Sequence, residues 1–343
     1  MADVIDMDTI GWGILGPGNI VRRFMNDLPR CKGVKLAAVG SRSANKAKEF
    51  ADQYHFEKSW GSYEELIRDE SVDIIYVATP HPFHREQAIL CMEAGKAVLC
   101  EKPVAVNASQ TREMVECARK NNVFFMEGMW TRHFPVNIKV KEIIDSGVLG
   151  QVTLIQADFG FGRWDHGKVS NSSGRLYAPE LAGGSLLDVG VYCVSFASYI
   201  TGMQPSKIEA ISTMVETGVD GMTVCLFQYE NGGAAMLQSS IVQSTRQTAM
   251  IYCEHGAIEI PNFWNPSRAI IQYNQPSVRR EVIEIPFNDD GATGFNFEVE
   301  EAMNCLRVGL KESPRMTWQE SIDVMRTMDR IRGKIGLRYA FED

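Results

Sequence analysis

Short apolar runs alternate with amphipathic segments along the first third of the chain. The runs predict buried β-strands, and the amphipathic segments between them predict helices. The predicted strands span residues 11–15, 34–39, 74–78, 97–100 and 123–126, and the predicted helices span 20–28, 45–54, 63–68, 85–94 and 110–121. Strands that alternate with helices form βαβ units, so this pattern indicates a doubly wound parallel sheet of the Rossmann type.

The pattern changes after about Gly128. A further helix, a strand, a loop rich in glycine, serine and asparagine, and a second helix are predicted at 135–146, 151–159, 160–174 and 185–201. Strand-like runs joined by short turns follow at 208–215, 223–229, 234–243, 248–253, 269–273 and 281–285, before a helical segment at 296–336. We therefore expect an α/β protein. Residues 8–128 are predicted to form a dinucleotide-binding domain, and residues 129–343 an α+β domain with a large open, mostly antiparallel sheet.

Composition narrows the class of protein. The 343 residues include 35 Lys and Arg against 43 Asp and Glu, which gives a net charge of −8 and disfavours nucleic-acid binding. None of the eight cysteines forms a CxxC pair, so neither a metal cluster nor a disulfide framework is expected. The first ten residues hold three acids and no base, and no uninterrupted apolar run approaches the ~20 residues of a membrane helix. We expect a cytoplasmic protein with no membrane partner.

The first predicted strand runs into a glycine-rich loop, Gly16-Pro17-Gly18-Asn19-Ile20, which opens a predicted helix. Glycines at the first and third places allow backbone N–H groups to approach a pyrophosphate, which faces the positive end of the helix. Val21 stands where the full fingerprint has Gly or Ala, and GxG by itself is also found in ordinary turns. The place of the loop, after a first strand and before a helix, favours dinucleotide binding.

The end of the second strand carries the signal for the kind of dinucleotide. An NAD site usually has an acid here, whereas an NADP site has a hydroxyl and an arginine for the 2′-phosphate. This chain has Ser41 and Arg42, with Lys46 nearby, so NADP is favoured over NAD. The alternative is an ordinary helix cap at Ser43 beside a solvated arginine.

Candidate chemistry follows two later strands and opens one later helix. Thr79, Pro80 and His84 follow the fourth strand, and Glu101 and Lys102 end the fifth, at the carboxyl edge where such sheets bind ligands. Asp188 and Tyr192 are four residues apart and share a face of the predicted helix. A tyrosine, with an ordinary pKa of about 10, becomes a useful base near a cation such as Lys102, and Asp188 is expected to orient the substrate or the lysine. Each of these residues taken singly is more often structural.

The motifs at 16–20, 78–84, 101–103 and 184–192 together resemble the glucose–fructose oxidoreductase/inositol dehydrogenase/rhizopine catabolism (Gfo/Idh/MocA) family. The tail, with Phe297-Glu298 and residues 307–314, is similar as well. Most members have His where this chain has Tyr192, and Tyr192 together with residues 126–132 resembles the branch of dimeric dihydrodiol dehydrogenase and D-xylose dehydrogenase.

The resemblance implies a Rossmann domain followed by an open-sheet domain that commonly mediates dimerisation. It also implies that Lys102 and Tyr192 handle the proton, that Asp188 lies in the substrate site, and that Trp130 and Arg132 lie near the nicotinamide. The expected activity is NADP-dependent hydride transfer involving a secondary alcohol or carbonyl of a sugar, cyclic polyol or vicinal diol. A non-catalytic NADP-binding regulator and a physiological carbonyl reductase are the alternatives. Four aromatic residues are candidates for lining the substrate pocket, which the loop 160–174 would cover: Phe159, Phe161, Trp164 and Trp264.

Overall fold

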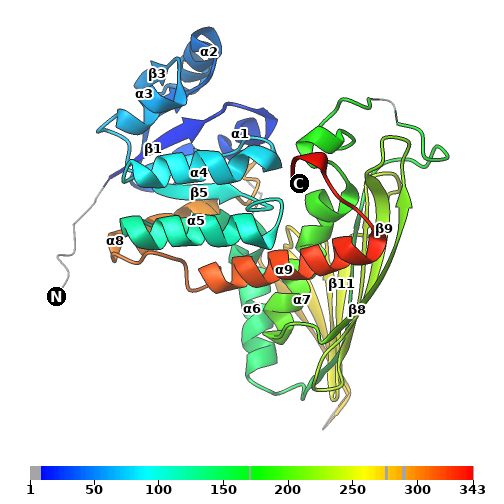
Figure 1. Cartoon of the computed structure of the whole chain (residues 1–343). Helices are drawn as coiled ribbons and strands as arrows, with labels where there is room; N and C mark the ends of the chain where they lie inside the picture. Colours follow the sequence, from blue (N-terminus) through cyan, green and yellow to red (C-terminus); the bar gives the residue numbers. More distant parts are fainter. Residues whose placement is uncertain (1–8, 170, 275–276, 288–290, 343) are drawn as a thin grey trace. The chain divides into compact units, whose positions relative to one another are not determined.

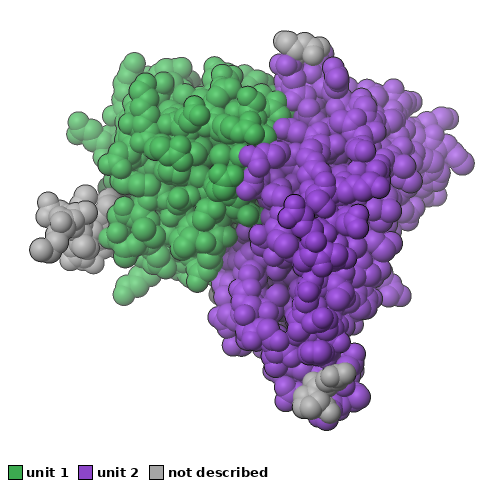
Figure 2. Space-filling model, turned by 60° about the horizontal axis from the view of Figure 1, so that its bottom comes forward, with its two compact units in different colours: residues 1–130, 287–322 green, residues 131–286, 323–343 purple. Residues whose placement is uncertain are grey.

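The computed structural model describes residues 9–342 except 170, 275–276 and 288–290. The chain forms two compact units, which Figure 2 shows in green and purple: residues 1–130 with 287–322, and residues 131–286 with 323–343. The division predicted at residues 128 and 129 falls within two residues of the first break between the units. Residues 287–322 return to the first unit.

The first unit is built on a six-stranded sheet in the order β3-β2-β1-β4-β5-β6. Its strands are β1 (Ile10–Leu15), β2 (Val34–Gly40), β3 (Lys58–Trp60), β4 (Ile74–Val77), β5 (Ala97–Glu101) and β6 (Phe125–Gly128). Every neighbouring pair is parallel, which confirms the predicted doubly wound sheet. The short edge strand β3 was not predicted, because its three residues are only partly buried and show no apolar run. Strand β6 begins two residues later than predicted.

Helices connect these parallel strands. They are α1 (Asn19–Phe24), α2 (Ala44–Tyr54), α3 (Tyr63–Arg68), α4 (His84–Glu93) and α5 (Ala108–Asn121), with α8 (Asn296–Arg307) added from the later segment. The side chains of Ser43, Ser62 and Asn107 cap α2, α3 and α5. Helices α4 and α5 pack together along the sheet (Figure 1). The first helix is shorter than predicted because Pro29 lies in a separate 3-10 turn, Leu28–Arg30.

The second unit contains an eight-stranded sheet in the order β14-β13-β12-β11-β7-β10-β9-β8. Its strands are β7 (Val152–Gly160), β8 (Lys207–Met214), β9 (Asp220–Gln228), β10 (Ala234–Ser240), β11 (Thr248–Cys253), β12 (Gly256–Pro261), β13 (Arg268–Tyr273) and β14 (Arg279–Glu284). All neighbours are antiparallel except β7 and β10, which confirms the predicted mostly antiparallel sheet. Strand β12 is the one that the sequence pattern missed.

One face of this sheet carries α6 (Pro135–Asp145) and α7 (Val191–Thr201), and no described helix of the unit covers the other face (Figure 1). The predicted helix at 185–201 begins with a π-helical turn, Leu186–Gly190, before the regular α7. The last long helix is α9 (Trp318–Ile335). By length and composition, one stretch of the described chain, Pro179–Thr201, is apolar enough to cross a membrane. Its apolar window is 94% buried, as in a core helix.

Candidate active site

The glycine loop joins β1 to α1 as the sequence predicted. Gly16 has φ +83°, and a Cβ there would lie 2.7 Å from Thr79 Cγ2, so this turn requires glycine. Pro17 is half-buried, while Gly18 and Asn19 are exposed at the start of α1, and no described side chain caps that end of the helix. Val21, which stands where the common fingerprint has a smaller residue, is completely buried. Ile20 is half-buried beside it.

The end of β2 brings Arg42 to a tyrosine that the sequence patterns did not single out. The Arg42 guanidinium lies beside the Tyr63 hydroxyl and acts to lower the pKa of Tyr63, while partial burial raises that pKa above its usual value. The same hydroxyl lies 3.5 Å from where a Gly16 Cβ would be, so Tyr63 adjoins both Arg42 and the glycine loop. Ser41 is buried, its hydroxyl accepting a bond from the Ser43 N–H, and Lys46 is exposed on α2.

His84 ties together the loops that follow β4 and β5. Its Nε2 lies 2.6 Å from the carbonyl oxygen of Thr79, and its Nδ1 lies 3.0 Å from that of Pro103. The ring is completely buried, and this burial lowers the pKa of His84. The Thr79 hydroxyl donates to Gln87 Oε1 at 2.5 Å. Through His84, the backbone beside Thr79 and Pro80 is therefore fixed to the backbone beside Lys102.

Glu101 is held inside the first unit, and the adjacent Lys102 side chain is half-buried. The Tyr76 hydroxyl donates to Glu101 Oε1, and the Lys102 backbone N–H donates to Glu101 Oε2 at 3.2 Å. A second acid, Glu298 of α8, is completely buried close by, and its carboxyl oxygens have no hydrogen-bond partner in the described part of the chain. Burial and the nearby charges of Glu101 and Asp27 raise the pKa of Glu298 well above its usual value. This acid was noticed in the sequence only as part of the family-like tail.

Trp130 and Arg132, which the resemblance places near the nicotinamide, belong to different units. Trp130 is buried and stacks on Phe295, with ring centroids 4.4 Å apart. Arg132 is buried against α7, where Nε donates to Ser195 Oγ at 3.0 Å and Nη2 donates to the Ser195 carbonyl oxygen at 2.9 Å. These contacts give Arg132 a clear structural role in the second unit.

The π-helical turn that carries Asp188 is anchored by a buried carboxylate, Asp220. Asp220 Oδ2 accepts bonds from Ser185 Oγ and the Leu186 N–H, both at 2.7 Å, and from Thr223 Oγ1 at 2.8 Å. Burial raises the pKa of Asp220 to about 6 in spite of these bonds. The sequence analysis missed Asp220, and no local pattern distinguishes it, because two of its partners, Ser185 and Leu186, lie far away along the chain.

Asp188 and Tyr192 lie on the same helical segment, on either side of the junction between the π-turn and α7. Asp188 Oδ1 accepts a bond from Arg175 Nη1 at 2.6 Å, and Arg175 is a residue that the sequence analysis also missed. Tyr192 is only 7% exposed, and its ring lies 5.3 Å from that of Phe159. A π-helical turn within a longer helical segment is frequently found at functional sites.

Of the four aromatic candidates, two gather near Tyr192. The Trp264 ring stacks on Phe159 at 5.0 Å between centroids, and Trp264 Nε1 donates to Gln247 Oε1. Phe161 is half-buried, and Trp164 is 41% exposed on the loop that was predicted from 160 to 174. The described residues of that loop, which exclude residue 170, form neither helix nor strand after β7 ends at Gly160.

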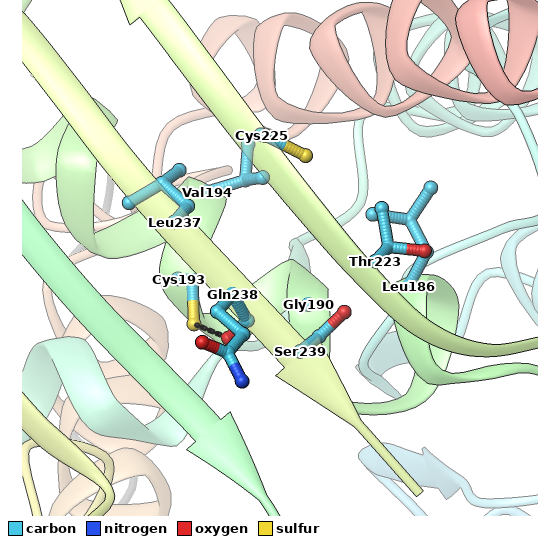
Figure 3. A pocket seen from close by; sticks show the side chains of 9 residues that line it. All are labelled: Leu186, Gly190, Cys193, Val194, Thr223, Cys225, Leu237, Gln238 and Ser239. Carbon is cyan, nitrogen blue, oxygen red and sulfur yellow. Dashed lines mark hydrogen bonds between the residues drawn. The ribbon is translucent and has the colours of Figure 1, made fainter. Parts of the chain in front are cut away.

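A small, mostly apolar pocket lies between the helical segment and strands β9 and β10 (Figure 3). Its lining includes Cys193, whose thiol donates to the Gln238 carbonyl oxygen at 3.4 Å, and Cys225. Burial raises the pKa of both thiols. The cysteines are therefore un-ionised core groups, and we assign this pocket to imperfect core packing. Within the described ranges, no group of three His, Cys, Asp or Glu side chains could hold a metal ion.

Comparison with known proteins assigns both parts of the chain. Residues 10–129 match the family model described as an oxidoreductase family with an NAD-binding Rossmann fold, and residues 137–259 match the GFO/IDH/MocA C-terminal domain. The chain belongs to the Gfo/Idh/MocA oxidoreductase family. This confirms the resemblance seen in the motifs.

Curated relatives extend the similarity over nearly the whole chain. Trans-1,2-dihydrobenzene-1,2-diol dehydrogenase of Xenopus tropicalis is 37% identical over 96% of this chain and 98% of the relative. The Homo sapiens protein of the same name is 36% identical, over 96% of this chain and 97% of its own length. These relatives agree with the branch that Tyr192 and residues 126–132 indicated.

Solved structures share the fold. Levoglucosan dehydrogenase, in complex with NADH and levoglucosan, has a TM-score of 0.84 at 18% identity, over 96% of this chain and 97% of that one. Aldose–aldose oxidoreductase from Caulobacter crescentus has a TM-score of 0.84 at 24% identity, over 95% of this chain and 97% of that one. A 3-ketoreductase from Actinomadura kijaniata in complex with NADP has a TM-score of 0.79 at 22% identity, over 95% of this chain and 98% of that one.

The first unit of this Gfo/Idh/MocA chain fits a nicotinamide dinucleotide. The backbone at Gly16 makes a tight turn with φ +83° that has no room for a Cβ, and the exposed N-terminus of α1 follows directly. Arg42 supplies an exposed cation at the end of β2, the position that contacts the adenosine ribose in such folds. These residues would hold the pyrophosphate and the ribose, respectively.

Proposed function

We propose that this protein is an NADP-dependent dehydrogenase that oxidises a secondary alcohol of a vicinal diol, cyclic polyol or sugar. The observation that carries the proposal is the similarity to dihydrodiol dehydrogenases over 96% of the chain. The presence of Lys102, Asp188 and Tyr192 favours an enzyme over a non-catalytic regulator, which would have no need for residues that transfer protons.

The proposed chemistry divides between the cofactor and the protein. A bound nicotinamide supplies the hydride acceptor. Tyr192 removes the hydroxyl proton, and Lys102 supplies the positive charge that stabilises the tyrosinate. Asp188 binds the substrate, and the nearby Phe159 and Trp264 rings offer an apolar surface to its carbon skeleton.

Three residues support NADP as the preferred cofactor. Ser41 and Arg42 stand at the end of β2 where an NAD-specific site usually has an acid. Tyr63 adds a hydroxyl beside the Arg42 guanidinium and restricts where that side chain lies. A 2′-phosphate carries negative charge that a fixed guanidinium binds well.

A homodimer is proposed from the open face of the eight-stranded sheet. Strand pairing aligns one row of side chains across all eight strands: Glu209, Leu226, Met236, Gln156, Met250, Glu259, Ile270 and Val282. Leu226, Met236 and Val282 are 45–52% exposed in this row. A sheet face with large exposed apolar side chains is typical of a surface that is buried by a second copy.

A cytoplasmic location is proposed on the chemistry of the cysteines. All eight lie among the described residues as free thiols, and most are buried. Free thiols of this number are typical of a reducing compartment.

The test is the formation of NADPH, followed by its absorbance in the near ultraviolet, with NADP⁺ and a panel of aldoses, cyclic polyols and aromatic dihydrodiols. Tyr192→Phe and Lys102→Ala are each expected to lower kcat by about 10²–10⁴-fold, with NADPH binding retained. Tyr54→Phe, on helix α2, serves as the control and is expected to retain activity. Near-wild-type turnover of Tyr192→Phe would overturn the assignment of the base.

A further inference from the structure

The carboxylate of Asp188 accepts a hydrogen bond from an arginine. Arg175 Nη1 lies 2.6 Å from Asp188 Oδ1, and both residues belong to the second unit. The Asp188 side chain is 9% exposed, whereas that of Arg175 is 48% exposed. A buried carboxylate therefore holds one edge of a guanidinium that also reaches solvent.

The two groups offer opposite hydrogen-bonding capacities side by side. A guanidinium only donates and a carboxylate only accepts. A hydroxyl group does both, so it matches an Arg–Asp pair better than a ketone oxygen, which only accepts. Hydrogen bonds to charged groups are also stronger than those between neutral groups, which makes such a pair an effective reader of a hydroxyl.

The place of the pair in the fold indicates which hydroxyl it reads. Asp188 lies on the π-turn that Asp220 anchors through Ser185 and Leu186, so its backbone is fixed. Tyr192, the proposed base, follows one helical turn later. A substrate whose reacting hydroxyl is at Tyr192 needs a second polar group close to the first in order to reach Asp188.

We propose that the Arg175–Asp188 pair binds the hydroxyl group next to the reacting carbon and thereby selects vicinal diols over simple alcohols. The inference rests on the proposed function, because it takes Tyr192 as the base. It assigns Arg175 as a specificity-determining residue, and it narrows the substrate class to compounds with adjacent hydroxyl groups.

The experiment compares trans-cyclohexane-1,2-diol with cyclohexanol as substrates of the wild type and of Arg175→Met. Methionine keeps much of the length of the arginine side chain but removes its charge and its donors. The wild type is expected to prefer the diol in kcat/KM, and Arg175→Met is expected to reduce that preference by about 30-fold, mainly through KM. Arg175→Lys, which keeps the charge, is expected to restore part of the preference.

Arg163→Met is the matched control, since Arg163 is an exposed arginine in the predicted loop 160–174, which directly precedes Arg175. Circular dichroism melting confirms that each variant is folded. An equal loss of kcat/KM for both substrates in Arg175→Met would overturn the inference, because Arg175 would then only position Asp188. An unchanged preference would overturn it as well.

Equilibrium binding of the two compounds, followed by tryptophan fluorescence, separates the inference from the proposed function. Binding of the diol that depends on Arg175, without turnover of any alcohol by the wild type, would support the inference and contradict the proposed dehydrogenase. Turnover of diols with a preference that does not depend on Arg175 would leave the dehydrogenase standing and remove the inference.

Discussion

Asp220 accepts a hydrogen bond from the backbone N–H of Leu186 at 2.7 Å, so a residue of β9 holds the first residue of the π-turn that carries Asp188. The same carboxylate oxygen accepts the Ser185 hydroxyl. It acts as a cap for a helical segment from outside that segment. The placement of the proposed substrate-binding acid therefore depends on a buried group on a neighbouring strand.

The first prediction concerns pH. The pKa of Asp220 is raised from 3.8 to about 6, so between these values the folded protein binds a proton that the unfolded chain has lost. The contribution of Asp220 to stability is therefore greatest below pH 4, falls as the pH rises to about 6, and is constant above it. The fall is about 3 kcal/mol at 1.36 kcal/mol per pKa unit.

Denaturant unfolding of wild type and Asp220→Asn between pH 4 and 8 measures this effect. As the pH rises from 4 to 8, the free energy of unfolding of the wild type is expected to fall relative to that of Asp220→Asn, because asparagine does not ionise. Asp145→Asn, which removes an exposed acid paired with Lys141, is the control. A difference that does not vary with pH would contradict the raised pKa.

The second prediction concerns Gly184. It has φ +123°, and a Cβ there would lie 2.1 Å from Asp220 Oδ1. Gly184→Ala is expected to destabilise the protein by about 2–4 kcal/mol, through backbone strain and a clash with the anchor of the π-turn. Thermal unfolding measures the loss.

Gly202→Ala separates the two causes of that loss. Gly202 also has a positive φ, +63°, but nothing lies within 4 Å of its Cβ position. Only the backbone strain remains there, so a loss of about 1 kcal/mol is expected. Equal losses at the two positions would show that the clash with Asp220 contributes nothing.

The third prediction concerns the choice of cofactor. Tyr63→Phe removes the hydroxyl beside Arg42 and is expected to raise the Kd for NADP⁺ by about 5–10-fold, with a smaller effect on NAD⁺. Arg42→Ala is expected to have a larger effect in the same direction. Calorimetric titration with both dinucleotides measures the Kd values.

Arg68→Ala, an exposed arginine at the end of α3, is the control for the loss of charge in this region. A wild type that binds NAD⁺ more tightly than NADP⁺ would refute the proposed preference itself. If Tyr63→Phe weakened the binding of NADP⁺ and NAD⁺ equally, the hydroxyl would contact a part of the dinucleotide that both cofactors share.

The fourth prediction concerns the open sheet face. Leu226 and Met236 lie opposite each other on β9 and β10 and are 50% and 45% exposed. Leu226→Arg is expected to convert the proposed dimer to a monomer of 38.4 kDa, because it places an unpaired charge in an apolar interface. Light scattering after size exclusion measures the mass.

Val308→Arg is the control, because Val308 is 66% exposed but follows α8 in the first unit. A wild type that elutes as a monomer at micromolar concentration would contradict the dimer. So would a Leu226→Arg variant that keeps the wild-type mass.

The parallel sheet was predictable because buried strands such as Ile74–Val77 form continuous apolar runs, and connecting helices such as Ala44–Tyr54 and Ala108–Asn121 show apolar residues at helical spacing. The two missed strands lack that signal: Lys58–Trp60 is a short edge strand, and Gly256–Pro261 is a short strand with a polar position on its outer face. The π-turn was read as α-helix, since one extra residue in a turn barely alters the apolar pattern.

The sequence by itself determined the two folds, the glycine loop after the first strand, and the set of candidate residues Lys102, Asp188 and Tyr192. These follow from local order along the chain, where apolar period, turn residues and motif spacing act over a few residues. Only the tertiary structure decided the partners of these groups. Arg175 meets Asp188, Asp220 anchors Leu186, and Tyr63 meets Arg42 because folding brings different elements together, and a side chain's partner across space leaves no mark in the residues beside it.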